Sequence, residues 1–291
     1  MKKIIARIKG GLGNQLFCYA AARRLAIAND AELVIDHITG FMRDREYRRK
    51  YMLDRFHIPV RTASRAELLQ PFERYRRGLL KIVSRKRSYA ERKYIEEEGE
   101  EFDDRLLALR VEGTLYLDGL WQSPAYFADV EEVVRKDLRF IPPGDLANQQ
   151  AAEAIRKSEA VALHVRWHNA PESSRIGNAP KEYYQRAIAF LDSEIGSPHY
   201  FLFSDHPKFA REMVNLPDDR VTTISHNAGD AAAHLDMWLM TRCKHFITAN
   251  STYSWWGAWL AENEEKIVVT PGTFRTMQGD PPIVAAELNL R

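Results

Sequence analysis

The 291-residue sequence is poor in cysteine, with only Cys18 and Cys243, and it lacks any apolar run of about 18 residues. Two lone cysteines in segments expected to be helical exclude a cysteine-ligated metal cluster. They are typical of buried thiols in a reducing compartment. The first residues, Met1 to Arg7, lack the apolar segment of a secretory leader. We therefore expect a soluble, cytoplasmic protein without a transmembrane helix.

The chain also lacks a large net charge, which is +2 at pH 7, so nothing global indicates nucleic-acid binding. Charge is instead local, with +11 between Phe41 and Lys93 and −9 between Tyr94 and Asp137. The plainer interpretation is two solvated helical faces that attract each other. The sharper one is a peripheral contact between the basic stretch and the inner face of the cytoplasmic membrane.

No Asp-x-Asp pair occurs anywhere in the sequence. The metal-chelating motif of Mg- or Mn-dependent sugar transferases is therefore absent, and we expect neither a metal site nor a cofactor.

Length and element order predict an α/β protein of two domains, residues 1–145 and 146–291, joined near Pro142-Pro143-Gly144-Asp145. Alternating strands and helices predict two Rossmann-like domains with parallel sheets that face each other across a cleft. Ligands bind such sheets at the carboxyl ends of the strands, so we examine those ends most closely. In the first domain the pattern predicts strands at 4–8, 31–36 and 111–117, a loop at 10–15, helices at 16–28 and near 125–137, and a helical, basic insertion at 43–110. In the second domain it predicts strands at 160–166, 200–204, 221–224, 245–249 and 267–270, and helices at 181–194, 207–215, 231–242 and 253–261.

The glycine-rich loop after the first strand offers close backbone approach to a ligand through Gly11 and Gly13, with amide groups from Asn14 and Gln15. It is similar to a dinucleotide fingerprint but lacks the third glycine. Asp36 ends the second strand, where an NAD enzyme holds a ribose. An NAD-dependent oxidoreductase and a plain tight turn both stay open at this point.

Two strand ends in the second domain carry groups suited to a nucleotide. Alternation places His164 and Arg166 on one side of their strand, with Arg166 suited to a phosphate and His164 to a base or ribose. An Arg166 that forms a salt bridge at the strand end is the competing interpretation. Asp205 ends the next strand, where it could accept both hydrogen bonds from a guanine or cap a helix.

A third strand end is followed by Asn250, Ser251 and Thr252 and then by a tryptophan-rich helix. Capping side chains and backbone N–H groups at a helix N-terminus form a site for an anion such as a pyrophosphate. An ordinary capped helix that packs its indoles into the core is the competing interpretation.

Five segments carry a resemblance to a known family. They are GGLGNQLF at 10–17, GLWQSPAYF at 119–127, HVR at 164–166, FSDH at 203–206 and NSTYSWW at 250–256. Together they resemble glycosyltransferase family 11, the α-1,2-fucosyltransferases, in a short bacterial form. The family's pattern H-x-R-R-G-D matches the segment that starts at His164 only in its first and third positions.

This resemblance implies a GT-B-like fold and metal-independent, inverting transfer from GDP-β-L-fucose to the 2-hydroxyl group of a galactoside, in O-antigen or other surface polysaccharide synthesis. It implies that Arg166 holds the β-phosphate with Ser251 and Thr252 beside it. His164 and Asp205 are then expected at the guanosine, and Asn14 near the fucose and pyrophosphate. Gly11, Gly13, Gln15 and Asn250 complete the expected donor-binding set.

The sequence departs from the family pattern where Trp167 and Asn169 replace its second Arg and its Asp. Asn169 cannot act as a general base, so Glu172 and His168 are the nearby substitutes, beside a weakly assisted route through an oxocarbenium-like transition state. Arg166, Glu172 and His168 are thus the catalytic candidates. The acceptor-side candidates are Asp36, Trp121, Gln122 and Trp167.

Two further alternatives stay open. One is transfer of a related GDP-deoxysugar such as colitose. The other is a sugar-nucleotide-binding relative without catalysis, which Trp167 and Asn169 would favour.

Overall fold

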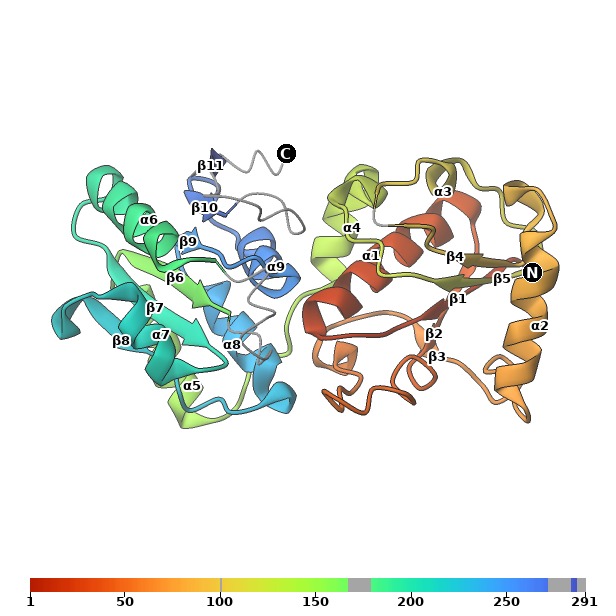
Figure 1. The fold of residues 1–291 in the computed structure, drawn as a ribbon, viewed down its shortest axis with the longest axis horizontal. Helices are drawn as coiled ribbons and strands as arrows, with labels where there is room; N and C mark the ends of the chain where they lie inside the picture. Colours follow the sequence, from red (N-terminus) through yellow and green to blue (C-terminus); the bar gives the residue numbers. More distant parts are fainter. Residues whose placement is uncertain (100, 167–178, 272–283, 287–291) are drawn as a thin grey trace. The chain divides into compact units, whose positions relative to one another are not determined.

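The computed structural model describes residues 1–99, 101–166, 179–271 and 284–286 of the chain. Contacts within the chain divide it into two compact units, Met1–Ile141 and Pro142–Arg291, each built around one sheet (Figure 1). The division lies at the first residue of the Pro142-Pro143-Gly144-Asp145 segment.

The first unit has a five-stranded sheet in the order β3-β2-β1-β5-β4, and all of its strand pairs are parallel. Its strands are β1 (Lys3–Arg7), β2 (Glu32–Asp36), β3 (Arg61–Thr62), β4 (Tyr94–Glu96) and β5 (Thr114–Asp118). The first strand in the chain is thus the central one, and its middle residues are fully buried because both faces are covered.

Helices of the first unit lie on both faces of this sheet. They are α1 (Leu12–Asn29), α2 (Glu73–Arg85), α3 (Arg105–Ala108) and α4 (Glu131–Asp137), with short 3₁₀ turns at Leu53–Arg55, Tyr89–Glu91, Pro124–Tyr126 and Ala128–Val130. Helix α1 packs on β1 and β2, and an apolar cluster that includes Ile5 and Val34 lies against α2 on the other face. The helix predicted near residues 125–137 is therefore divided into two 3₁₀ turns and α4.

The predicted helical insertion at 43–110 is wrong in part, because the segment supplies two strands of the sheet, β3 and β4. Its long helix is α2, and the remainder is turns and short helices. The glycine loop is also shorter than predicted, since α1 begins at Leu12 and takes Gly13, Asn14 and Gln15 into its first turn.

The second unit has a six-stranded sheet in the order β11-β10-β9-β6-β7-β8, parallel except for the β10–β11 pair. Its strands are β6 (Ala160–Val165), β7 (His199–Ser204), β8 (Val221–Thr223), β9 (His245–Ile247), β10 (Val268–Thr270) and β11 (Val284–Ala286). The order outward from β6 is that of a Rossmann sheet with one antiparallel edge strand. The prediction of parallel α/β sheets in both halves is confirmed.

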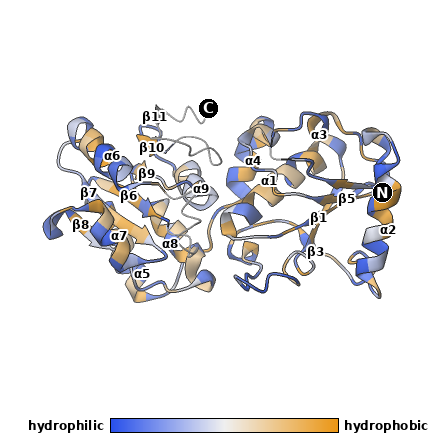
Figure 2. Cartoon of the chain, viewed as in Figure 1, coloured by the Kyte–Doolittle hydropathy of each residue, from blue (hydrophilic) through white to orange (hydrophobic). Residues whose placement is uncertain are grey.

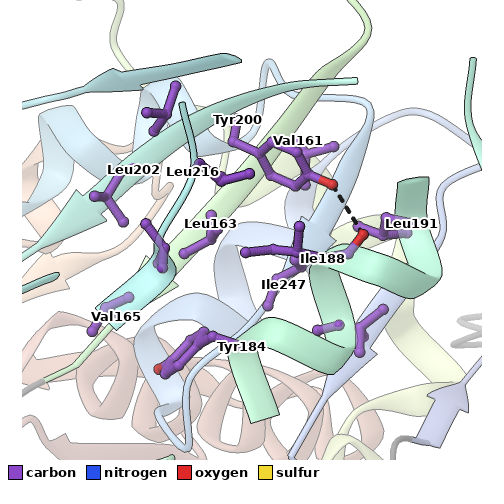
Figure 3. Packing of buried hydrophobic residues seen from close by; sticks show 14 of the residues in the cluster. Val161, Leu163, Val165, Tyr184, Ile188, Leu191, Tyr200, Leu202, Leu216 and Ile247 are labelled. Carbon is purple, nitrogen blue, oxygen red and sulfur yellow. Dashed lines mark hydrogen bonds between the residues drawn. The ribbon is translucent and has the colours of Figure 1, made fainter. Parts of the chain in front are cut away.

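Helices of the second unit are α5 (Leu146–Arg156), α6 (Lys181–Glu194), α7 (Pro207–Val214), α8 (Ala233–Met240) and α9 (Thr252–Leu260), with 3₁₀ turns at Asp218–Arg220 and Asp230–Ala232. Side chains from β6 and β7 pack against α6 and α7 in one buried cluster. Figure 3 shows this packing, in which Tyr200 points its hydroxyl group at the carbonyl oxygen of Ile188, 3.3 Å away. Hydrophobic residues concentrate on the strands of both sheets (Figure 2).

Candidate active site

The chain connections of the second sheet reverse direction between β6 and β9. Strands β7 and β8 extend the sheet to one side of β6, and β9 and β10 extend it to the other. In α/β proteins, ligands bind outside the carboxyl ends of the strands at such a reversal. Arg166 follows β6 at this place, and the Asn250-Ser251-Thr252 segment follows β9.

Arg166 forms an ion pair with Asp205, with 2.8 Å between Nη1 and Oδ2. The pairing of Val165 with Ser204 in the sheet places the two residues side by side, one position beyond each strand. Both side chains are partly exposed, so the pair itself adds little to stability. A guanidinium carries five N–H donors, and one such pair leaves most of them for a second anion. The structure thus brings together two residues for which the sequence suggested separate contacts.

The N-terminus of α9 is held in a tight hydrogen-bonded turn. Ser251 is its N-cap, and its Oγ accepts from the Tyr253 N–H at 3.3 Å. The Ala249 N–H donates to Oγ of Ser254 at 3.2 Å, which fixes the chain before the helix. A hydroxyl that accepts in a cap still has its own proton to donate. Ser251 can therefore cap α9 and bind an anion there together with the N–H groups of the first turn.

Asn250 lies in the same turn and has a buried Oδ1 without a hydrogen-bond partner among the residues that the structure describes. Buried polar atoms in folded proteins are nearly always paired, with protein, water or ligand. The side-chain amide of Asn250 therefore supports a polar ligand at this strand end.

His164 is almost fully buried, and its ring lies 5.4 Å from the ring of Tyr253, centroid to centroid. Tyr253 donates from its hydroxyl group to the carbonyl oxygen of Ala233 at 2.6 Å, and burial raises its pKa well above the ordinary value. His164 therefore joins β6 to α9 behind the strand end. This geometry favours a role in positioning the turn over an open contact with a base.

Asp236 on α8 is a titratable group that the sequence reading missed. Burial raises its pKa to about 7, although Asn227 donates to Oδ1 from Nδ2 at 2.9 Å. Its only signal in the sequence is a single carboxylate within the apolar helix at 231–242.

In the first unit, the structure brings Asn14 and Gln122 together, since Nε2 of Gln122 donates to Oδ1 of Asn14 at 2.8 Å. Gly10 has φ of +79°, and a Cβ there would lie 2.8 Å from Nδ2 of Asn14, so glycine is required. Gly11 is the extended N-cap of α1, and Gly13 is buried in its first turn.

Gln15 has a different role from the donor contact expected of it. It is fully buried, its Nε2 donates to the carbonyl oxygens of Gly10 and Lys50, and its Oε1 accepts from the Met52 N–H at 2.9 Å. With its amide satisfied by the backbone, Gln15 anchors the loop that follows β2.

Asp36 and Trp121 are not accessible to an acceptor in this structure. Asp36 is fully buried, and its carboxylate accepts from the backbone of Ile38 and Thr39, from the Thr39 hydroxyl and from Nη2 of Arg77. Trp121 is 1% exposed. A Cβ on the neighbouring Gly119 would lie 2.5 Å from the indole. Both side chains therefore hold the fold of the first unit, which corrects the acceptor contacts expected of them.

A network of ionised side chains at the carboxyl edge of the first sheet was also not predicted from the sequence. Asp118 ends β5 and lies 3.0 Å from Nη1 of Arg7 and 2.9 Å from Nζ of Lys9, and it accepts from the Tyr94 hydroxyl at 2.6 Å. Burial would raise the pKa of Asp118, but Lys9 and Arg7 outweigh it and hold that pKa well below its usual range. The signal that could have found this network is a charged residue at the end of each of three strands.

Three candidates, Trp167, His168 and Glu172, lie outside the described residues, as does Asn169. Within the described ranges, no group of three His, Cys, Asp or Glu side chains is placed to hold a metal ion. Both cysteines are free and buried, as expected, and burial raises the pKa of Cys18 to about 12. Among the helices that the structure describes, none has the length and apolar character needed to cross a bilayer.

Solved structures with the same fold include fucosyltransferases. A fucosyltransferase NodZ from Bradyrhizobium matches with a TM-score of 0.54 at 16% identity, over 92% of this chain and 95% of that one. A point mutant of FUT1 from Arabidopsis thaliana, in complex with GDP, matches with a TM-score of 0.58 at 13% identity, over 95% of this chain and 71% of that one. The likeness confirms the prediction of a GT-B-like α/β fold.

Two curated relatives from Escherichia coli align over almost the whole chain. An alpha-1,2-colitosyltransferase is 26% identical over 93% of this chain and 92% of its own length. The O-antigen biosynthesis glycosyltransferase WbnK is 31% identical over 91% of this chain and 92% of its own. The model of the family described as glycosyl transferase family 11 matches residues 3–278. The resemblance seen in the motifs is thereby confirmed, and the chain belongs to glycosyl transferase family 11.

Proposed function

We propose that this glycosyltransferase moves L-fucose from GDP-β-L-fucose to the 2-hydroxyl group of a terminal galactoside, with inversion, without a metal ion or cofactor, in surface polysaccharide synthesis. Two findings support it. One relative is an α-1,2-transferase and the other makes O-antigen. A NodZ α-1,6-fucosyltransferase of the same fold was co-crystallised with GDP.

The observation that carries the proposal is the position of Arg166 at the switch point, beside the capped N-terminus of α9. When the bond between C1 of the sugar and the phosphate oxygen breaks, that bond's electron pair stays on GDP as negative charge. A guanidinium fork and a helix N-terminus both stabilise charge that develops there. Ser251, Thr252 and Asn250 then supply polar contacts at the pyrophosphate.

The acceptor must lose one proton as its oxygen attacks C1. We assign this proton to Glu172 or His168, because Asn169 stands where the family pattern has an aspartate and an amide accepts no proton at neutral pH. In this proposal Gln122 and Trp167 are acceptor-side groups, and Asn14, whose amide is linked to that of Gln122, contacts the donor sugar.

Colitose is the second candidate for the transferred sugar, because one relative is a colitosyltransferase. Colitose is fucose without its 3-hydroxyl group. A site that hydrogen-bonds a hydroxyl group rejects the analogue lacking it by about 10⁴-fold, whereas a site without such contacts discriminates far less. The ratio of kcat/KM for the two donors therefore reports whether this site binds the 3-hydroxyl group.

The test is release of GDP from GDP-fucose and from GDP-colitose by the full chain, with EDTA, in the presence of lactose, of a β1,3-linked galactoside or of no acceptor. We expect acceptor-dependent release from GDP-fucose and an α-1,2 linkage by NMR. Release only from GDP-colitose would replace the donor and keep the reaction. Tight binding of both donors without any turnover would overturn the proposal in favour of a sugar-nucleotide-binding protein.

Glu172→Gln, with His168→Gln beside it, tests the base. If Glu172 takes the proton, E172Q lowers kcat strongly and H168Q does not. The pH profile of kcat for E172Q then loses the fall on its acid side that protonation of the base causes. The reverse pattern assigns His168. Near-wild-type rates in both variants would show that no dedicated base exists.

A further inference from the structure

Helix α2 turns an apolar stripe outward, away from its own sheet. The stripe recurs every three or four residues, which places its members on one face of a helix. Its members and their exposed fractions are Phe72 72%, Tyr75 79%, Leu79 64%, Ile82 57% and Val83 43%. Hydrophobic and hydrophilic residues alternate along α2 (Figure 2). Exposed large side chains occur singly on most surfaces, so four on one short helix and a fifth at its N-cap need an explanation.

The inward face of α2 carries buried polar side chains beside one apolar residue, Leu80, which packs on the apolar cluster of the first unit. Arg77 is buried and reaches Asp36 at 3.0 Å, and Nζ of Lys81 reaches Oε1 of Glu96 at 2.5 Å. Ser84 is buried and accepts from the Tyr94 N–H at 3.0 Å. Rotating α2 about its axis so that its outer face turned inward would break these bonds. It would also leave the buried carboxylate of Asp36 without the guanidinium of Arg77. The sheet therefore fixes the apolar stripe outward.

Cations flank the stripe on both sides. At 100° per residue, Arg76 lies along one side of the stripe and Arg74 and Arg85 along the other, with Lys86 and Arg87 beyond the last turn. All five are exposed. Within α2, Glu73 is the only acidic residue. An apolar face bordered by Lys and Arg is the pattern of a helix that lies in the headgroup region of a bilayer.

We propose that α2 binds the surface of an anionic bilayer, with its apolar stripe at the boundary between headgroups and acyl chains. Thirteen residues span roughly 20 Å, so α2 is too short to cross the membrane and lies in its plane. The inference goes beyond the proposed function and does not depend on it. It assigns the contact that the basic composition between Phe41 and Lys93 suggested to one helix face.

A second copy of the chain fits this surface poorly. A symmetric dimer places the same patch on both partners. Paired stripes would then bring the rows of Arg from one copy against those of the other, and like charges across an interface disfavour association. Anionic headgroups instead meet these cations with opposite charge.

The test is sedimentation of the full chain with vesicles of phosphatidylcholine alone and with about 30% phosphatidylglycerol. We expect binding to the anionic vesicles that weakens in about 0.5 M NaCl. Leu79→Asp should lower the partition coefficient about ten-fold or more, and Lys86→Glu with Arg87→Glu should lower it less. Leu146→Asp is the matched control, because that leucine is 68% exposed and stands alone on α5. The L146D variant should bind like the wild type. Circular dichroism checks that each variant is folded.

A labelled variant gives a second measurement that does not remove the apolar face. Cys18 and Cys243 are buried, so an environment-sensitive maleimide dye would react selectively with Leu79→Cys. We expect a blue shift of its emission on anionic vesicles and none for a label at Leu146→Cys. Equal vesicle binding by wild type and L79D, or no binding by either, would overturn the proposal. A dimer in sedimentation velocity that L79D converts to a monomer, without vesicle binding, would assign the stripe to self-association.

Discussion

Asp118 and Asp236 are largely buried carboxylates whose surroundings move their pKa values in opposite directions. Asp118 lies among Arg7, Lys9 and the Tyr94 hydroxyl, and the two cations lower its pKa in spite of burial. Asp236 has an amide as its hydrogen-bond partner, and burial raises its pKa to about 7. The first belongs to the unit that begins at Met1 and the second to the unit that ends the chain.

The carboxyl edges of the two sheets differ in the same way. In the first unit, Asp36 and Asp118 have their charges matched by protein cations, so the edge is a closed network. In the second unit, Arg166 shares one carboxylate, Ser251 keeps a hydroxyl proton, and Asn250 has a buried oxygen without a partner in the described chain. Similar polar residues at strand ends therefore satisfy one another in the first unit, and in the second unit they keep hydrogen-bonding groups for the anion that we propose.

Removing one member of the closed network should have the largest effect. Asp36→Ala leaves Arg77 buried without its carboxylate, and breaking such a buried pair costs about 3–5 kcal/mol of unfolding free energy. The measurement is urea unfolding followed by circular dichroism. Asp54→Ala, which breaks an exposed pair with Arg55, is the control and should cost less than about 0.5 kcal/mol. A small effect of D36A would show that the first edge is as open as the second.

Arg166→Ala should leave stability nearly unchanged and lower kcat/KM by about 10²–10³-fold, or 3 kcal/mol or more, the scale for a charged donor lost from such a site. Arg166→Lys is the matched variant, since it keeps the charge and loses the fork. GDP release measures the rate and thermal unfolding measures stability. If R166A lost stability and kept near-wild-type activity, the second edge would be structural like the first.

Asp236→Asn should raise stability at neutral and alkaline pH. Because the folded pKa lies above the ordinary value near 4, the folded state holds a proton between pH 4 and 7 that the unfolded state has lost. Wild-type stability therefore falls as pH rises through this range, and the asparagine variant escapes that loss. We expect a gain of about 1–2 kcal/mol at pH 8 and almost none at pH 4, since one pKa unit is about 1.4 kcal/mol and solvent reduces the effect. Urea midpoints at several pH values measure it, and a gain independent of pH would contradict the assignment.

Ser251→Ala should lower the free energy of unfolding by about 1 kcal/mol, the smallest of the main effects expected here, because it removes one capping hydroxyl from α9. If the same hydroxyl donates to the donor's pyrophosphate, KM for the sugar nucleotide rises as well. Ser251→Thr keeps both functions and is the control. A loss of stability without any change in KM would confine Ser251 to the cap.

Much of this fold could be predicted from the sequence, because long segments with a strong hydrophobic pattern indicate their own secondary structure. Helix α6 has the predicted bounds, Lys181–Glu194, and β6 ends one residue before its predicted end. Strands β3 and β4 were missed within the predicted insertion. They have two and three residues in a charged segment, and only their pairing with β2 and β5 makes them strands.

The site was readable in part. Strand ends drew attention to Arg166 and Asp205, but their ion pair depends on the register of β6 and β7, which sequence does not reveal. The burial of individual side chains was the other property that the sequence did not predict. Asp36 and Trp121 have the residue types of a sugar site, yet Asp36 is fully buried and Trp121, with a positive φ of 53°, is 1% exposed. The backbone contacts of Gln15 were not predicted, because the loop that its side chain binds is more than 30 residues away in the chain.

The central position of β1 has a consequence for synthesis on the ribosome. Strand β1 leaves the ribosome well before β5, its neighbour on one side, which is made more than a hundred residues later. At 5–20 residues per second the wait is roughly 5–20 s, during which the apolar strand has only β2 beside it. The nascent first unit therefore presents an open strand edge that chaperones can bind, and slow codons before β5 would prolong that exposure.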